Sequence, residues 1–174
     1  MKMKLISDAI SGSLHNAFEK MLGANVDLLD SPTDQATPTR HDAMAVIGMG
    51  GEGMEATLNL LFAERSAEFI VKVMLEEVAV DGAETVRDGI GEFANLIAGG
   101  IKARFHSQGI DVTLGLPSVV IAQDLKFSTS AVGAVHPFRF AIDGKHIVDG
   151  LFVIREAIPH GEQQAELSSS ETKR

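Results

Sequence analysis

The chain has 174 residues, a length typical of one domain with a substantial hydrophobic core. Its formal net charge of −9 opposes nonspecific attraction to nucleic acid or anionic lipid, and the absence of cysteine excludes disulfides, thiol catalysis and thiolate metal sites. No segment approaches the roughly 20 apolar residues of a membrane-spanning helix, and the basic start MKMK is not followed by a charge-free apolar segment. We therefore expect a cytoplasmic protein that binds neither nucleic acid nor membrane.

The first half of the chain alternates between helical and strand patterns. Apolar residues at helical spacing predict an amphipathic helix over 5–22. Two prolines and the lack of periodicity predict a loop over 30–40. The apolar run 43–47 and the alternating run 54–62 predict two strands of a hairpin, and residues 66–78 return to helical spacing.

The second half begins with a long helix, predicted over 83–108 and capped by Asp81. Strands follow over 112–116 and 118–122, with Pro117 interrupting them or lying at a sheet edge.

A hairpin closes the predicted fold, with strands over 131–142 and 146–157 joined by the turn Asp143-Gly144. Because the strands come in hairpins and do not alternate strictly with helices, we predict an α+β fold in which long helices pack on an antiparallel sheet. We expect one domain over 3–158 and a disordered polar tail over 159–174.

The helix predicted over 83–108 has two different faces. At 100° per residue, one side carries an apolar stripe suited to the core. Its members are Val86, Ile90, Phe93, Ile97 and Ile101. The other side carries a polar row of Asp88, Glu92, Asn95 and Gly99.

Glycine is unusually frequent in this helix, at positions 89, 91, 99 and 100. Each interior glycine costs about 1 kcal/mol relative to alanine. We interpret the glycines as keeping a bare surface around the polar row, which another molecule can approach closely.

Two other patterns predict no site. Residues 48–53 match the dinucleotide fingerprint G-x-G-x-x-G, but an alternating segment follows where a helix is required, so a glycine-rich hairpin loop is expected. The six histidines are dispersed and form no His-rich tract, so no metal site is predicted.

The polar row and a later proline form a recognisable pattern: Asp88, three residues, Glu92, two residues, Asn95, twenty-one residues, Pro117. This spacing resembles the signature of the CheX and CheC phosphatases, in which Asp or Ser, Glu, Asn and Pro stand at these intervals. Members of the CheC type carry two Glu-x-x-Asn sites and this chain has one, so the resemblance is to the CheX type.

The resemblance implies a CheC-like fold and a phosphatase that hydrolyses the aspartyl phosphate of a CheY-like receiver domain. In this family Asn95 would orient the attacking water, as glutamine does in small GTPases, and Glu92 would pair with the receiver's active-site lysine. Asp88, Gly91, Gly99 and Pro117 would form the binding surface. The resemblance also implies a homodimer with no cofactor of its own, because Mg²⁺ would be supplied by the receiver.

Two alternatives remain open at the level of sequence. One is a catalytically silent module of the same fold that acts as an adaptor in a motility or two-component signalling assembly. The intact Glu92 and Asn95 pair favours an enzyme over this adaptor. The weakest alternative is nucleotide binding through residues 48–53.

Overall fold

Alternating apolar residues form a single antiparallel sheet, and amphipathic helices cover one of its faces. The structure is a computed structural model that describes residues 3–21, 23, 25–29, 40–51, 53–76, 82–127 and 133–156. The helices are α1 (Met3–Met21), α2 (Glu64–Leu75) and α3 (Gly82–His106). The strands are β1 (Val26–Leu29), β2 (Ala43–Gly51), β3 (Met54–Phe62), β4 (Thr113–Leu114), β5 (Ser118–Ile121), β6 (Ala134–Ile142) and β7 (His146–Glu156).

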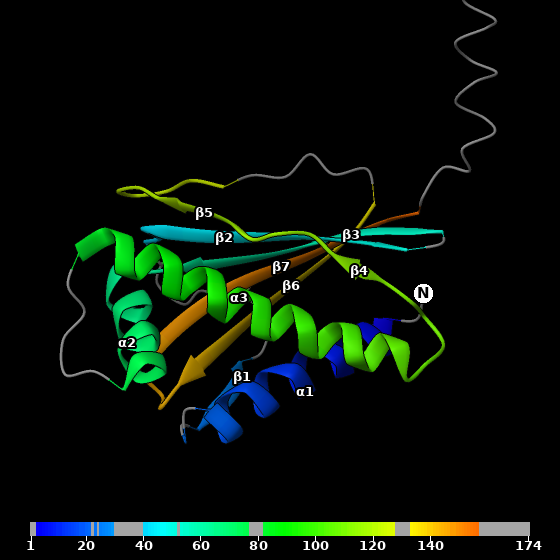
Figure 1. Ribbon diagram of the computed structural model, residues 1–174, viewed down its shortest axis with the longest axis horizontal. Helices are drawn as coiled ribbons and strands as arrows, with labels where there is room; N and C mark the ends of the chain where they lie inside the picture. Colours follow the sequence, from blue (N-terminus) through cyan, green and yellow to red (C-terminus); the bar gives the residue numbers. More distant parts are fainter. Residues whose placement is uncertain are drawn as a thin grey trace, which may run out of the picture.

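The sheet has the order β1-β6-β7-β3-β2-β4, and β5 also pairs with β2. Every pairing between its strands is antiparallel. Helices α1 and α2 both pack against α3, and all three lie on the same side of the sheet (Figure 1). The sheet edge formed by β2, β4 and β5 runs beside α3, which brings Pro117 close to the helix.

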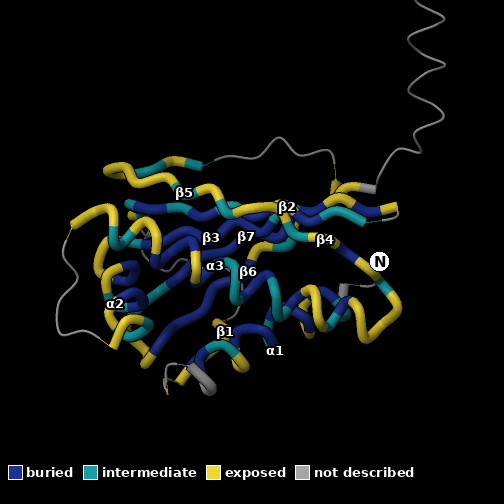
Figure 2. The backbone as a smooth tube through the Cα atoms, viewed as in Figure 1, coloured by how far each residue is buried: buried dark blue, intermediate teal, exposed yellow. Residues whose placement is uncertain are grey.

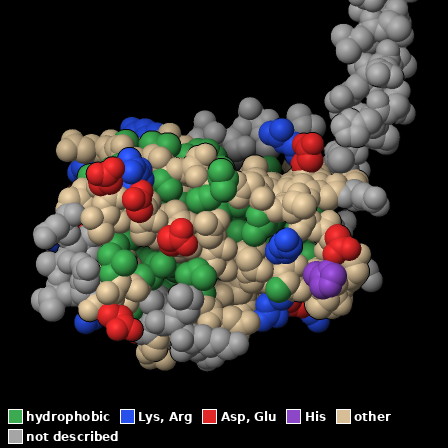
Figure 3. Space-filling view, viewed as in Figure 1, with side chains coloured by type: hydrophobic (Ala, Val, Ile, Leu, Met, Phe, Trp, Pro, Cys, Tyr) green, Lys and Arg blue, Asp and Glu red, His purple; other side chains and the backbone are tan. Residues whose placement is uncertain are grey.

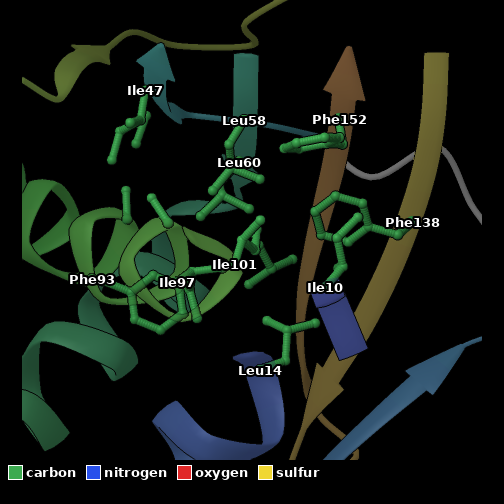
Figure 4. Close-up of a cluster of buried hydrophobic side chains, with 14 of the residues drawn as sticks. Ile10, Leu14, Ile47, Leu58, Leu60, Phe93, Ile97, Ile101, Phe138 and Phe152 are labelled. Carbon is green, nitrogen blue, oxygen red and sulfur yellow. The ribbon is translucent and has the colours of Figure 1, made fainter. Parts of the chain in front are cut away.

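The main core lies between the helices and this face of the sheet (Figure 4). Strand residues enter it at every second position, as in the pattern of buried Ala43, Ala45, Ile47 and Met49 along β2. Phe93 of α3 is 1% exposed, and its ring centroid lies 5.3 Å from that of Phe18 in α1. The core therefore fixes the rotation of α3 about its own axis.

The opposite face of the sheet holds a buried ion pair. Arg139 of β6 donates from Nη2 to Oδ2 of Asp149 in β7 at 3.0 Å, and Nε2 of His41 lies 2.8 Å from the same carboxylate oxygen. Burial raises the pKa of Asp149, but the hydrogen bonds to His41 and Arg139 outweigh burial and leave that pKa below its usual value. This ion pair ties β6 to β7 away from α3.

Most predicted elements are confirmed, with shifted ends. The hairpin turn at Asp143-Gly144 has positive φ at both residues, and the backbone N–H of Lys145 donates to the carbonyl oxygen of Ile142 across the turn at 3.1 Å. Strand β1 was not predicted, because its four residues are too few to show alternation, and pairing with β6 creates it. Asp81, residues 30–39 of the expected loop and the expected tail over 159–174 lie outside the described residues.

The prediction for residues 48–53 needs a correction. Gly48, Gly50 and Gly51 belong to β2 and pair with Thr57, Glu55 and Met54 of β3, so the hairpin loop is shorter than expected. Its tip includes Gly53, whose φ is +76°. The strand continues because pairing with β3 overrides the weak strand propensity of glycine. The segment leads into a strand and offers no helix N-terminus, so the nucleotide alternative loses its structural basis.

Candidate functional site

The rotation of α3 turns one side of the helix towards solvent. Ile90, Ile97 and Ile101 are completely buried on the inner side. On the outer side Asp88 and Glu92 are exposed, and Asn95 and Gly99 are half-buried. Buried, intermediate and exposed stretches accordingly follow one another along α3 (Figure 2). The predicted separation of the two faces is therefore correct. We call the outer residues Asp88, Glu92, Asn95 and Gly99 the polar row.

Glu92 and Asn95 lack a side-chain partner among the described residues. Within the described part of the chain, neither side chain makes a hydrogen bond or an ion pair. Both lie on the same side of one helical turn, since three residues correspond to about 300° of rotation and about 4.5 Å of rise. A carboxylate and a carboxamide are therefore held close together with their polar atoms available to another molecule.

A pocket of about 360 Å³ opens beside this turn. Its lining residues come from α3 and from the chain entering β5, and are Arg87, Asp88, Gly91, Glu92, Pro117 and Val119. The structure thus brings Asp88, Gly91, Glu92 and Pro117 together around one pocket. Asn95 and Gly99 do not line it and lie further along the polar row.

The sheet holds Pro117 against the helix. The backbone N–H of Gly115 donates to the carbonyl oxygen of Gly48 at 2.8 Å, and Ser118 pairs with Val46 in the sheet. A Cβ placed on Gly91 would lie 3.7 Å from Cγ of Pro117. Pro117 therefore lies beside α3 at Gly91, at a distance that would leave room for a methyl group, and forms one wall of the pocket.

Sequence reasoning missed two lining residues, Arg87 and Val119. The Arg87 guanidinium donates from Nε to Asp88 and from Nη2 to Glu84, each at 3.1 Å. The hydrogen bond and charge of Asp88, followed by those of Glu84, raise the pKa of Arg87. The i,i+3 spacing of Glu84 and Arg87 was a usable signal for this cluster, whereas the place of Val119 depended on the register of β5 against β2.

The interpretation of the helix glycines was only partly correct. A Cβ on Gly89 would lie 2.6 Å from Cγ2 of Val71 in α2, and one on Gly100 would lie 2.9 Å from Cβ of Ser13 in α1. These two glycines allow the neighbouring helices to approach α3 closely. Only Gly99, where a Cβ would have no neighbour within 4 Å, leaves bare surface in the polar row.

Two further features are absent from the described residues. No helix among them is both long enough and apolar enough to cross a membrane. They also contain no group of three or more His, Cys, Asp or Glu side chains placed to hold a metal ion.

Comparison with known proteins identifies relatives of the chain. The family model described as "Chemotaxis phosphatase CheX" matches residues 43–139, which is more than half of the chain and includes the polar row and Pro117. The chain is 27% identical over 128 residues to the CheY-P phosphatase CheX of Thermotoga maritima, covering 73% of this chain and 82% of the relative.

Solved structures show the same fold. The chemotaxis protein CheX of Vibrio vulnificus has a TM-score of 0.74 at 22% identity, covering 86% of this chain and 96% of that chain. The CheX-CheY-BeF3-Mg²⁺ complex of Borrelia burgdorferi contains a chain that matches with a TM-score of 0.70 at 19% identity, covering 88% of this chain and 97% of its own length. With the family match over residues 43–139, these findings place the chain in the CheX family of chemotaxis phosphatases.

Proposed function

We propose that this protein hydrolyses the aspartyl phosphate of a CheY-like receiver domain. The observation that carries the proposal is the pair Glu92 and Asn95, which project from the outer side of α3 without an internal partner in the described part of the chain. Support comes from the relative named CheY-P phosphatase and from the Borrelia burgdorferi structure, which is a complex of CheX with CheY.

Asn95 is proposed to position the attacking water. Hydrolysis forms a bond between the water oxygen and phosphorus and breaks the bond between phosphorus and the aspartyl oxygen, which releases phosphate. The water must stand in line behind phosphorus, and a carboxamide suits this task because its oxygen accepts from water while its nitrogen donates towards a phosphoryl oxygen. Strong basicity is not required, since catalysis of phosphoryl transfer is mainly positioning and charge stabilisation.

Glu92 is proposed to dock the two proteins. A carboxylate aimed at a phosphoryl group would be repelled by it, so a direct role in the chemistry is unfavourable. Pairing with a lysine of the receiver would instead let the Glu92 carboxylate stabilise the complex through a charge-assisted hydrogen bond. One helical turn separates Glu92 from Asn95, so this contact would bring the amide to the phosphorylated pocket.

The remaining predicted site residues are proposed to shape the contact surface. Asp88 and Pro117 line the pocket beside Glu92, and Gly91 lines the same pocket. Gly99 lets the partner approach α3 beyond Asn95. Mg²⁺ is proposed to arrive with the receiver, in keeping with the Mg²⁺ of the Borrelia burgdorferi CheX-CheY complex.

The proposal includes the homodimer implied by the resemblance. Size-exclusion chromatography with light scattering would give twice the 18.5 kDa mass of the chain. A mass equal to one chain at micromolar concentration would contradict the proposed homodimer. It would not contradict the proposed hydrolysis of the aspartyl phosphate.

The decisive experiment compares Asn95→Ala with the wild type on a purified receiver phosphorylated by a small phosphodonor. We expect phosphate release to lose about two orders of magnitude in kcat, the usual cost of removing one preorganised polar group at a reacting centre. Gln108→Ala, which removes an exposed amide just beyond α3, is the matched control and should retain full activity. Full activity of Asn95→Ala would overturn the mechanism.

Glu92→Ala separates docking from chemistry. It should raise the receiver concentration needed for half-maximal rate while kcat changes little, and Glu68→Ala on the exposed side of α2 is its control. A wild-type protein that binds the phosphorylated receiver without accelerating phosphate loss would instead identify an adaptor.

A further inference from the structure

The outer side of α3 changes its charge along its length. Glu84, Asp88 and Glu92 are exposed in the N-terminal part of the helix, and Lys102 is exposed towards the C-terminal end. Asn95 lies between them. Figure 3 looks onto this side of the molecule and shows mainly acidic side chains, with a basic one beside them, over the left part of α3, and basic side chains next to an acidic one and a histidine at its right end.

Lys102 lies on the same side of α3 as Asn95. Seven residues separate them, which places Lys102 within about 20° of Asn95 around the helix and about 10 Å along its axis. Gly99 lies between the two, where a Cβ would meet nothing within 4 Å. A partner seated on Asn95 therefore has open access to the ammonium group of Lys102.

Lys102 also has no ion-pair partner among the described residues. The other basic side chains of α3 have partners or point elsewhere. The Arg87 guanidinium is held by two carboxylates, and the Arg104 side chain packs against α1 at Gly12. His106 lies in contact with the carboxylate of Asp111.

We propose that Lys102 is a docking residue that binds carboxylates at the rim of the receiver's phosphorylated pocket. This inference rests on the proposed function. A pocket that holds Mg²⁺ presents carboxylate oxygens, because these are the ligands that Mg²⁺ prefers, and such a rim attracts a lysine ammonium.

Contacts of opposite charge on the two sides of Asn95 fix the direction in which the receiver lies along α3. Glu92 meets a basic group before Asn95, and Lys102 meets an acidic group after it. The reversed orientation would bring like charges together at both contacts, which is unfavourable. Lys102 is thus a specificity-determining residue that selects receivers with an acidic rim on the correct side.

A binding experiment tests this with a receiver loaded with beryllofluoride and Mg²⁺, titrated calorimetrically into the full chain. Lys102→Glu should raise Kd at least 10-fold, and Lys102→Arg should stay within 2-fold of the wild type. Lys72→Glu is the matched control, since Lys72 is an exposed lysine of α2 without an ion-pair partner in the described part of the chain. It changes the net charge equally and should leave Kd within 2-fold.

Kinetics on the phosphorylated receiver give the second readout. Lys102→Glu should raise KM at least 10-fold with kcat within 2-fold, and the wild-type KM should rise with ionic strength more steeply than that of Lys102→Ala. If Lys102 only complements the helix dipole, Lys102→Glu and Lys72→Glu should have equal Kd and equal KM. That result would overturn the inference. A change confined to kcat would overturn it as well.

The two proposals fail in distinguishable ways. If wild-type protein releases no phosphate but its Kd depends on Lys102, the docking inference stands and the phosphatase mechanism fails. If Asn95→Ala abolishes phosphate release while Lys102→Glu behaves like Lys72→Glu, the mechanism stands and the docking inference fails.

Discussion

The two sides of α3 obey different constraints although they belong to one helix. The inner side carries large apolar residues and two glycines that contact the neighbouring helices, so nearly every atom there has a close neighbour. The outer side carries Glu92 and Asn95, which have no partner in the described part of the chain, beside a glycine with open space around it. The inner side is explained by packing, whereas Glu92 and Asn95 make no side-chain hydrogen bond or ion pair within the described residues.

Glycine therefore has opposite roles on the two sides of this helix. The space beside Gly89 is filled by Val71 of α2, and the space beside Gly99 is open. Substitutions on the inner side should therefore change the free energy of unfolding and spare activity per folded molecule. Substitutions of Glu92 and Asn95 on the outer side should do the reverse.

The largest effect on stability is expected from Phe93→Ala. The buried ring contacts Phe18 and Phe62, with centroid distances of 5.3 and 6.1 Å. Its removal should lower the free energy of unfolding by about 3–5 kcal/mol, measured by urea denaturation. A loss below about 1 kcal/mol would show that the inner side of α3 does not form a closely packed core.

The next effect lies away from α3, at the ion pair on the opposite face of the sheet. Asp149→Asn removes the carboxylate that pairs with the buried Arg139, and should cost about 3 kcal/mol while phosphate release per folded molecule is unchanged. A large loss of specific activity in this variant would contradict the assignment of the site to the outer side of α3.

The same carboxylate also makes stability depend on pH. The pKa of Asp149 is lower in the folded protein than the ordinary value of about 3.9, so the unfolded state takes up its proton first as pH falls. Its contribution is fully present above about pH 4 and is lost as pH falls through the folded-state value. Urea titrations at several acidic pH values should show a shallower loss for Asp149→Asn than for the wild type.

A smaller loss is expected from Gly89→Ala. The added Cβ would lie 2.6 Å from Cγ2 of Val71, a short branched side chain that cannot move away cheaply. The strain should exceed the gain of about 1 kcal/mol in helix propensity and give a net loss of about 1–2 kcal/mol. In a Val71→Ala background, which provides space, the same substitution should be neutral or stabilising.

The smallest effect, and the one of opposite sign, is expected from Gly99→Ala. The new methyl group meets nothing within 4 Å, so helix propensity should raise the free energy of unfolding by up to about 1 kcal/mol. Under the proposed docking, the same methyl group should raise the KM for the phosphorylated receiver. A stabilised variant with unchanged KM would show that the partner does not approach α3 at Gly99.

Much of this site could be predicted from the sequence because it lies on one helix. The 3.6-residue repeat of Ile90, Phe93 and Ile97 assigns an inner side, and the positions of Glu92 and Asn95 follow from it. The hairpin turn at Asp143-Gly144 could be predicted for the same reason, since its signal is confined to neighbouring residues. Strand β1 could not be predicted, because four residues carry no clear period and their pairing depends on distant β6.

By itself, the sequence determined the faces of α3, the order of the hairpins and the spacing that identifies the family, because each depends on residues close together in the chain. Only the tertiary structure decided that Gly89 and Gly100 serve helix packing, that Gly99 stays bare, and that Pro117 forms a wall of the pocket beside Glu92. The physical reason is that a glycine has no side chain to indicate its surroundings. Its role is set by whichever part of the chain packs against it, and that part is distant in the sequence.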